Sequence, residues 1–356
     1  MQQVLQTINT HSKSSGCIVS LIGGRSENQD SAGYVDTPLG LLVVVCDGMG
    51  GMKGGKHASS LAVKTVIDDM NSSSAEDNAY DVVKNAVYHA NSVVYEEGRK
   101  EEFKGMGTTI VALLVSDNSA IAAQVGDSRI YQLRGGKKIF RTTDHSMVFD
   151  MVKANVITEE QARLSSCSNV ILKALGIAES VEPDVYELTY RKGDRFVLCT
   201  DGFWAAAEEN LIIKKLSAHK APDKLLASMS AEINEIGIQE GGNHDNLTAA
   251  IIDVHASSLI KDRFMVRDFV PQMFFFLVLI VSIGFNIYAC TRIHNMMSVR
   301  SDLEELKQEL IEVQENLTAF KLEKIIDKIS GRSKDNTTIS DNDALDNIIK
   351  QKLNNE

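Results

Sequence analysis

Residues 41–51 read LLVVVCDGMGG, an apolar run that ends at an aspartate followed by glycines. The run is short, rich in β-branched residues and bounded by turn residues, which is typical of a buried strand. Such a strand holds its last side chain rigidly at the edge of a sheet, and a neighbouring glycine lets the backbone approach a ligand closely. This stretch therefore predicts a sheet protein that places Asp47 at a sheet edge.

Further apolar runs and helical patterns alternate around this stretch, over about residues 15–256. Several runs are joined by short turns at 116–119 and 126–128, which favours antiparallel sheets because parallel neighbours need long crossovers. The pattern predicts an α+β fold with sheets inside and helices outside. The predicted strands are 41–46, 109–115, 120–125, 129–133, 195–199 and 247–252. The predicted helices are 55–70, 79–97, 146–154, 159–164, 208–216 and 222–235.

Aspartates recur directly after predicted strands or beside glycine: Asp30, Asp47, Asp127, Asp201 and Asp245. One Asp-Gly pair alone usually marks a turn. Five gathered carboxylates would repel one another unless a cation neutralised them, and Mg²⁺ and Mn²⁺ prefer oxygen ligands of this kind. The set therefore indicates a site for hard divalent cations.

The segments RSENQD, VVCDGMGG, GTT, GDSR, CTDGFW and HDNLTA occur in this order along the chain. In this order they resemble the metal-dependent protein phosphatases of type 2C, and the form DGMGG is similar to the bacterial branch. The resemblance covers residues 15–256, the expected catalytic domain. It implies a central antiparallel β-sandwich flanked by helices, and hydrolysis of phosphoserine and phosphothreonine by a metal-activated water.

Matched motif by motif, the resemblance implies two metals, Mn²⁺ or Mg²⁺, bridged by Asp47. The backbone carbonyl of Gly48 reaches one of them, and Asp201 and Asp245 hold the other. Asp30 supports the site directly or through water. Two such metals can activate water and clamp the phosphoryl oxygens during in-line attack.

The resemblance also implies a third, weaker metal, which Asp127 helps to hold together with Asp201. Arg25 matches the arginine that binds the substrate phosphate, and a guanidinium offers a planar fork of donors that fits phosphate. Asp47 and Arg25 are thus the expected catalytic residues.

Two positions depart from the pattern of some relatives: Gln29 replaces a glutamate, and Met49 replaces a histidine that is able to protonate the leaving oxygen. His145 and His244 are candidates for that role by residue type only, and a structural role is expected for both. Residues 147–176 correspond to a flap beside the active site, and we interpret them as a substrate-contact or gating element; a surface insertion is the alternative.

The formal charge of −11 and the pI of about 5.3 argue against nucleic-acid binding, which usually requires a basic face. The five cysteines form no CxxC pair and predict neither a disulfide framework nor a zinc site. Cys46 and Cys199 lie in apolar runs and are expected to be buried.

Residues 269–290, FVPQMFFFLVLIVSIGFNIYAC, carry no charge. At about 1.5 Å per helical residue they would extend about 33 Å, close to the thickness of a bilayer core, so we predict a transmembrane helix over 269–291. The first sixteen residues do not resemble a signal peptide. We therefore expect a single-pass membrane protein with a cytoplasmic catalytic domain and an extracytoplasmic tail.

In the tail, apolar residues recur at alternating spacings of three and four over 303–320. This heptad pattern predicts a coiled coil over 300–326, followed by a polar tail over 327–356. A weak homodimer through the tail, or pairing with the helix of another membrane protein, is expected. An amphipathic helix lying on the bilayer or on another domain is the alternative.

The leading functional hypothesis is a membrane-tethered serine/threonine protein phosphatase that acts on phosphorylated proteins, with a serine/threonine kinase as a candidate partner. The alternative is a membrane signalling adaptor with a degenerate phosphatase domain that acts through its tail. All matched aspartates and Arg25 are present, which favours the enzyme. The protein substrate and any signal sensed by the tail are not encoded in these patterns.

Overall fold

The computed structural model describes residues 3–11, 13–165, 167, 170–259, 282, 288, 292, 300–326 and 328. The chain divides into two compact units, Met1–Arg263 and Phe264–Glu356. The first unit contains two large antiparallel sheets, as the short connections predicted.

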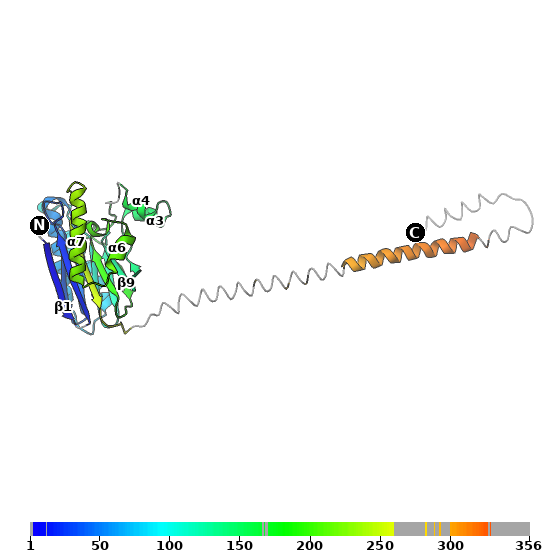
Figure 1. Ribbon diagram of the computed structural model, residues 1–356, viewed down its shortest axis with the longest axis horizontal. Coiled ribbons are helices and arrows are strands. Elements are labelled where there is room, and N and C mark those ends of the chain that lie inside the picture. Colours follow the sequence, from blue (N-terminus) through cyan, green and yellow to red (C-terminus); the bar gives the residue numbers. More distant parts are fainter. Residues whose placement is uncertain are drawn as a thin grey trace, which may run out of the picture. The chain divides into compact units, whose positions relative to one another are not determined.

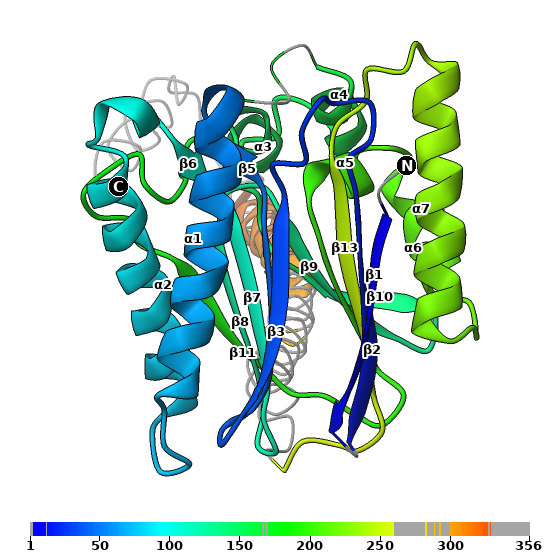
Figure 2. The same cartoon turned by 90° about the vertical axis from the view of Figure 1, so that its left-hand side faces the viewer.

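The first sheet has six strands that are all paired antiparallel. Their order is β1 (Gln3–His11), β2 (Ser14–Leu21), β13 (Leu247–Val254), β12 (Arg195–Cys199), β9 (Arg129–Arg134) and β10 (Lys137–Arg141). Helices α6 (Glu209–Leu216) and α7 (Pro222–Gln239) cover its outer face, and a separate hydrophobic cluster fills the space between the sheet and these helices (Figure 1, Figure 2).

The second sheet has five strands in the order β11 (Asp184–Leu188), β8 (Ala120–Val125), β7 (Ile110–Val115), β4 (Gly40–Cys46) and β3 (Ser31–Thr37). Its outer face is covered by α1 (Gly51–Asn71) and α2 (Ala79–Glu97) (Figure 2). All seven residues of β4 are buried, because Leu42, Val44 and Cys46 pack toward the helices while the alternate residues pack against the first sheet.

The unit is therefore a sandwich of two sheets between two helical layers, which confirms the predicted fold class. The predicted helices are all present, and α1 begins earlier than expected, at Gly51. The sequence analysis missed β1, β2, β3, β10 and β11, and β1 extends the unit to the N-terminal side of the expected boundary at residue 15.

One end of the sandwich carries the short elements that shape the site (Figure 2). They are β5 (Gly48–Met49), which pairs with β6 (Gly107–Thr108), the 3₁₀ helix Glu101–Phe103, α3 (Met147–Lys153), α4 (Glu159–Arg163) and α5 (Asp201–Trp204). Gly50, at a φ of 117°, forms the turn from β5 into α1, a conformation that favours glycine.

In the second unit, residues 300–326 form a continuous helix whose side chains are all exposed. The predicted membrane span, 269–291, lies outside the described residues except for Ser282 and Tyr288. Among the residues that the structure describes, no helix is both long and apolar enough to cross a membrane. The predicted polar tail, 327–356, lies outside the described residues except for Lys328.

Candidate active site

Asp47 directly follows β4, and two threonines fix its backbone. The Asp47 N–H donates to Thr109 Oγ1 (3.0 Å), while the Asp47 carbonyl accepts from the Thr109 N–H (2.8 Å) and the Thr108 hydroxyl (2.7 Å). Thr109 Oγ1 also lies 2.7 Å from Ser128 Oγ, in the turn between β8 and β9. The ends of β4 and β7 and the turn that follows β8 are thereby locked together beneath the site.

Asp201 begins α5, and only the N-cap residue Thr200 separates it from the end of β12 at Cys199. The Thr200 hydroxyl donates to Asp30 Oδ2 (3.0 Å), so Asp30 is held against this strand end and is only 2% exposed. Burial raises the pKa of Asp30 to about 7 and that of Asp201 to about 6, and neighbouring carboxylates add to both shifts.

Asp245 lies just before β13 and faces Arg25 from the loop after β2. Arg25 Nη2 donates to Asp245 Oδ2 at 2.9 Å, and the guanidinium remains about half exposed. Asn246 fixes this arrangement, because its side-chain amide donates to the carbonyls of Ile22 and Glu27 and accepts from the Gln29 N–H. The arginine is thus held at the rim by a loop that is tied to the strand carrying Asp245.

These groups meet in one cleft of about 860 Å³ at the end of the sandwich. The structure brings five of the seven predicted site residues together in it. The cleft is lined by Arg25, Asp47, Gly48, Asp201 and Asp245, with Gln29, Met49, Val170 and Ile171 around them. Asp30 does not line the cleft but lies beneath it.

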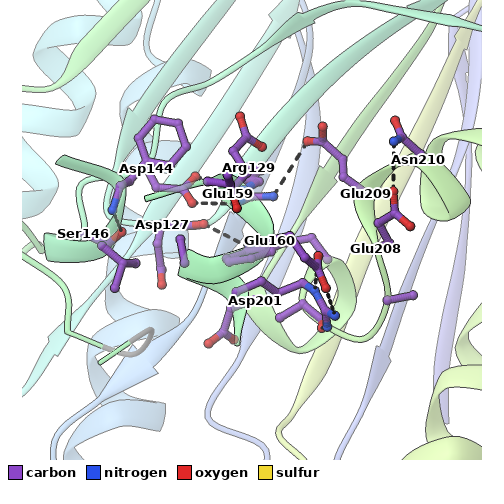
Figure 3. A pocket seen from close by; sticks show the side chains of 18 residues that line it. Asp127, Arg129, Asp144, Ser146, Glu159, Glu160, Asp201, Glu208, Glu209 and Asn210 are labelled. Carbon is purple, nitrogen blue, oxygen red and sulfur yellow. Dashed lines mark hydrogen bonds and ion pairs between the residues drawn. The ribbon is translucent and has the colours of Figure 1, made fainter. Parts of the chain in front are cut away.

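Asp127 lies apart from this cleft and lines a second cavity, of about 340 Å³, that it shares with Asp201. Figure 3 shows both aspartates among the side chains around this cavity, which lies between the flap helices and the start of α6. Trp204 Nε1 donates to the Asp127 carbonyl (3.0 Å), and the Arg129 guanidinium lies 3.4 Å above the Trp204 ring. The turn that carries Asp127 is therefore joined to the helix that Asp201 begins.

Arg129 itself has a structural role. It is 7% exposed and makes a two-pronged ion pair with Asp144, with N–O distances of 2.9 and 2.7 Å. Its Nη1 also donates to the Tyr131 hydroxyl (3.1 Å).

The carboxylates fit hard divalent cations by their chemistry. Burial and the neighbouring aspartates raise the pKa of Asp47 and of Asp127 well above the usual range, so negative charge there is costly without a counter-charge. The buried Oδ1 atoms of Asp127 and Asp201 have no hydrogen-bond partner within the described part of the chain. No three described acidic, histidine or cysteine side chains, however, form a complete metal site by themselves.

Close packing requires a glycine at position 48, because a Cβ there would lie 2.0 Å from the Gly55 carbonyl oxygen and 2.6 Å from that of Gln29. No other residue type fits there without a shift of the backbone. The donor set and this close backbone approach are consistent with cations held at the end of β4.

His145 and His244 both contribute to packing rather than to the cleft. His145 Nδ1 accepts from the Gly126 N–H (3.1 Å), and its Nε2 lies 3.3 Å from Asp184. His244 Nε2 contacts Asn234 Oδ1 (3.1 Å), and its ring fills the space beside Gly237. No histidine is present among the described residues that line the cleft.

The flap is tied to the rest of the unit near its C-terminal end. Leu172 N–H donates to the His145 carbonyl (2.7 Å), and Leu175 pairs with Thr108 through two backbone hydrogen bonds. Directly before these anchors, Val170 and Ile171 reach the cleft. The flap therefore forms part of the wall around the carboxylates, as the interpretation of 147–176 as a substrate-contact element requires.

Four residues that shape the site were not predicted from the sequence: Thr108, Thr109, Thr200 and Asn246. Three of them are buried at 0% exposure and the fourth at 5%, each beside a predicted aspartate or within a quoted motif. Their position within GTT, CTDGFW and HDNLTA was a usable signal, although only the structure shows which groups they bind.

Comparison with known proteins agrees with the fold and the cleft. Residues 20–237 match the family model described as protein phosphatase 2C. A putative protein phosphatase 2C-type from Streptococcus pyogenes is 34% identical over 235 residues, which is 64% of this chain and 92% of that protein.

Solved structures give the same result. The S. agalactiae serine/threonine phosphatase superposes with a TM-score of 0.60 at 32% identity, over 68% of this chain and 99% of that one. The catalytic domain of the serine/threonine protein phosphatase PstP, solved in complex with two manganese ions, has a TM-score of 0.56 at 30% identity over 68% of this chain and 98% of that one.

A two-sheet sandwich with a carboxylate cleft and an arginine at its rim thus defines the class of this protein, a bacterial-type serine/threonine phosphoprotein phosphatase. The chain belongs to the protein phosphatase 2C family. Phosphatases of this family depend on Mn²⁺ or Mg²⁺.

Proposed function

We propose that this chain removes phosphate from phosphoserine and phosphothreonine of target proteins in the cleft at the end of the sandwich, while anchored to a membrane. The observation that carries the catalytic part is the convergence of Asp47, Asp201 and Asp245 with Arg25 in one cleft. These residues come from strand ends of both sheets, so the fold itself gathers them.

In this proposal Asp47, Asp201, Asp245 and the Gly48 carbonyl hold two divalent cations, Mn²⁺ or Mg²⁺, with Asp30 in support. Asp127 and Asp201 hold a third. When bound, such cations neutralise the phosphoryl oxygens and make water a stronger nucleophile at neutral pH.

The residues of the chain then have separate tasks. Arg25 orients the phosphate, since among the described residues only one of its guanidinium N–H groups is bound, to Asp245, and the guanidinium remains half exposed at the rim. The hydrogen bonds between the Asp47 backbone and the side chains of Thr108 and Thr109 keep the Asp47 carboxylate in place. Met49 lines the cleft where an acid would be useful and cannot donate a proton, so the leaving oxygen must take its proton from another group.

The membrane anchor is supported by the uncharged segment over 269–290 and by the basic residues Lys261, Arg263 and Arg267 that precede it. Basic residues before the span favour a cytoplasmic catalytic domain, with the tail on the other side. A serine/threonine kinase is the proposed source of the phosphorylated substrate. The tail is proposed to bring the chain together with a second copy or with another membrane protein.

The adaptor alternative predicts that the cleft does not catalyse phosphate hydrolysis. Hydrolysis of a phosphothreonine peptide by residues 1–260 in the presence of Mn²⁺, compared with the Asp47→Ala variant, separates the two. The enzyme hypothesis predicts that the wild type hydrolyses the peptide and that Asp47→Ala does not. Equal rates for both proteins, or no hydrolysis by either, would favour the adaptor.

A further inference from the structure

The helix over 300–326 presents an unpartnered apolar seam. Six side chains of the seam are between 51% and 68% exposed: Leu303, Leu306, Leu310, Val313, Leu317 and Phe320. Their spacings of three and four place them at positions a and d of successive heptads, starting with Leu303 at a. We propose that this seam pairs with the same seam of a second copy of this chain, parallel and in register.

The charges beside the seam select the partner and its direction. With Leu303 at a, the g positions hold Asp302, Glu309, Asn316 and Glu323, and the e positions hold Lys307, Gln314, Lys321 and Lys328. All eight of these side chains are exposed. In a parallel pair, each g residue faces the e residue five positions later on the partner helix.

Parallel pairing therefore places Asp302 opposite Lys307 and Glu323 opposite Lys328 of the other copy, twice each by symmetry. The two middle g–e pairs each join a charged residue to an amide, so no like charges meet at the g–e contacts. In an antiparallel pair, e residues would face e residues and g residues would face g residues, which brings lysines together and acidic groups together. The charge pattern thus complements itself only when the helices run in the same direction.

The register follows from the next a position. Lys324 occupies this position, four residues after Phe320, the last residue of the seam. A slip of one heptad would place this ammonium against Leu317 of the partner and leave two layers of the seam uncovered. In register, all six apolar residues meet their own counterparts, so this alignment covers the most apolar surface.

The parallel direction also agrees with the proposed membrane anchor, because two copies that span one bilayer present their tails in the same direction. Anchoring raises their effective concentration, which a seam of this length requires. The inference rests on the proposed anchor in this respect only, since the charge and seam patterns are properties of the helix itself.

Disulfide crosslinking of the full-length chain in isolated membranes tests the arrangement. In a Cys167→Ser, Cys290→Ser background, Leu303→Cys introduces a thiol in the seam, and Glu305→Cys introduces one on the outer side of the same turn as a matched control. Parallel, in-register helices bring the two 303 positions within disulfide reach, so we expect at least about tenfold more crosslinked dimer at 303 than at 305. In an antiparallel pair centred on the seam, the two 303 positions would lie about 25 Å apart at 1.5 Å per residue.

A charge exchange tests partner choice. Lys307→Glu with Lys328→Glu makes the first and last g–e contacts acidic on both sides, whereas Asp302→Lys with Glu323→Lys makes the same two contacts basic on both sides. Each double variant carrying Leu303→Cys should lose most of its crosslinking when expressed alone and regain it when the two are expressed together. Equal crosslinking at 303 and 305, or no recovery on co-expression, would overturn the proposal in favour of another partner for the seam.

Two readouts on the same samples keep this result separate from the proposed function. Hydrolysis of a soluble phosphopeptide should be the same for every tail variant, because none of the changes touches the cleft. Membrane fractionation reports on the anchor. If crosslinking fails while hydrolysis and membrane association are unchanged, the result counts only against pairing through the seam.

Discussion

Asp47 combines burial with four neighbouring carboxylates, so we expect it to be needed for function and unfavourable for stability. Replacing it by asparagine keeps the shape of the side chain and removes the charge, so repulsion with Asp201 and Asp30 falls. We expect the Asp47→Asn variant to lose more than about a hundredfold in kcat. In the presence of chelator, its melting temperature should be equal to or above that of the wild type.

Parallel assays of phosphopeptide hydrolysis and thermal unfolding measure both effects. Asp36→Asn, at an exposed aspartate of β3, is the matched control and should change neither. A marked fall in the melting temperature of Asp47→Asn would show that the carboxylate is needed for the fold, contrary to this account.

Arg25 is expected to act on the substrate rather than on the fold. Removing a charge-assisted hydrogen bond to phosphate typically costs about 1.5–3 kcal/mol, so Arg25→Ala should lower kcat/KM for a phosphopeptide by roughly ten- to a hundredfold, mainly through KM. Arg99→Ala is the suitable control, because Arg99 is exposed and pairs with Glu96 in the adjacent turn. Unchanged kinetics for Arg25→Ala would remove the phosphate-binding role.

Arg129 would be a misleading control for this experiment. Its guanidinium is buried in the ion pair with Asp144, and removing one partner of a buried pair typically costs about 3–5 kcal/mol of stability. A loss of activity in an Arg129 variant would therefore report on unfolding.

At the residue scale, the sequence predicts the three aspartates and the arginine that the structure brings into one cleft, but it does not predict the residues that support them. An aspartate after a strand carries a recognisable pattern. A threonine such as Thr109, which bonds the backbone of Asp47 from another strand, does not, because its partner is set by tertiary packing.

At the scale of single elements, the flap is the part of the site that differs most from the rigid strand ends. Many of its apolar side chains are exposed, among them Met147 (40%), Val156 (64%), Leu164 (69%), Val170 (42%) and Leu172 (53%). Among the flap residues that the structure describes, only Val170 and its neighbour Ile171 reach the cleft. This places the apolar edge of the flap where residues flanking the phosphorylated side chain would lie.

A charge at this edge should weaken peptide binding without affecting the chemistry. We expect Val170→Asp to raise KM for a phosphothreonine peptide by about three- to tenfold, from the lost burial of one apolar side chain, and to leave p-nitrophenyl phosphate hydrolysis within about twofold. Val156→Asp, on the flap but away from the cleft, should change neither. An equal loss with both substrates would mean that the substitution disturbs the carboxylates instead.

Among the elements, the helices and most central strands were predictable, whereas the edge strands and the central strand β2 were not. β4 and β7 are continuous apolar runs because both of their faces are covered. β1 and β3 lie at sheet edges, and the sequence of β3, SAGYVDT, is largely polar or only partly buried. Without a second covered face, such strands lack the run of apolar residues on which sequence patterns depend.

At the scale of the whole molecule, the proposed topology makes the two ends of the chain differ in accessibility. Glu101→Cys places a thiol on an exposed turn of the catalytic unit, and Glu315→Cys places one on the helix at a heptad position facing away from the seam. With Cys167 and Cys290 replaced by serine, an impermeant thiol reagent applied to intact cells should label position 315 and not position 101. Both should be labelled after lysis.

Labelling of position 101 in intact cells would reverse the orientation, and labelling of neither position would place both ends inside. The sequence predicts this topology only from the apolar segment 269–290 and its flanking charges. Those residues lie largely outside the described part of the chain, so the topology stays a prediction.

The central claim, that the gathered aspartates act by holding divalent cations, is tested most directly by removing and restoring the metal. The purified protein would be treated with EDTA, transferred to chelator-free buffer and titrated with Mn²⁺ while hydrolysis of a phosphothreonine peptide is followed. The account predicts no hydrolysis before Mn²⁺ is added, saturable recovery on titration, and no recovery at any Mn²⁺ concentration for Asp47→Ala. Hydrolysis that continues in the presence of chelator would contradict it.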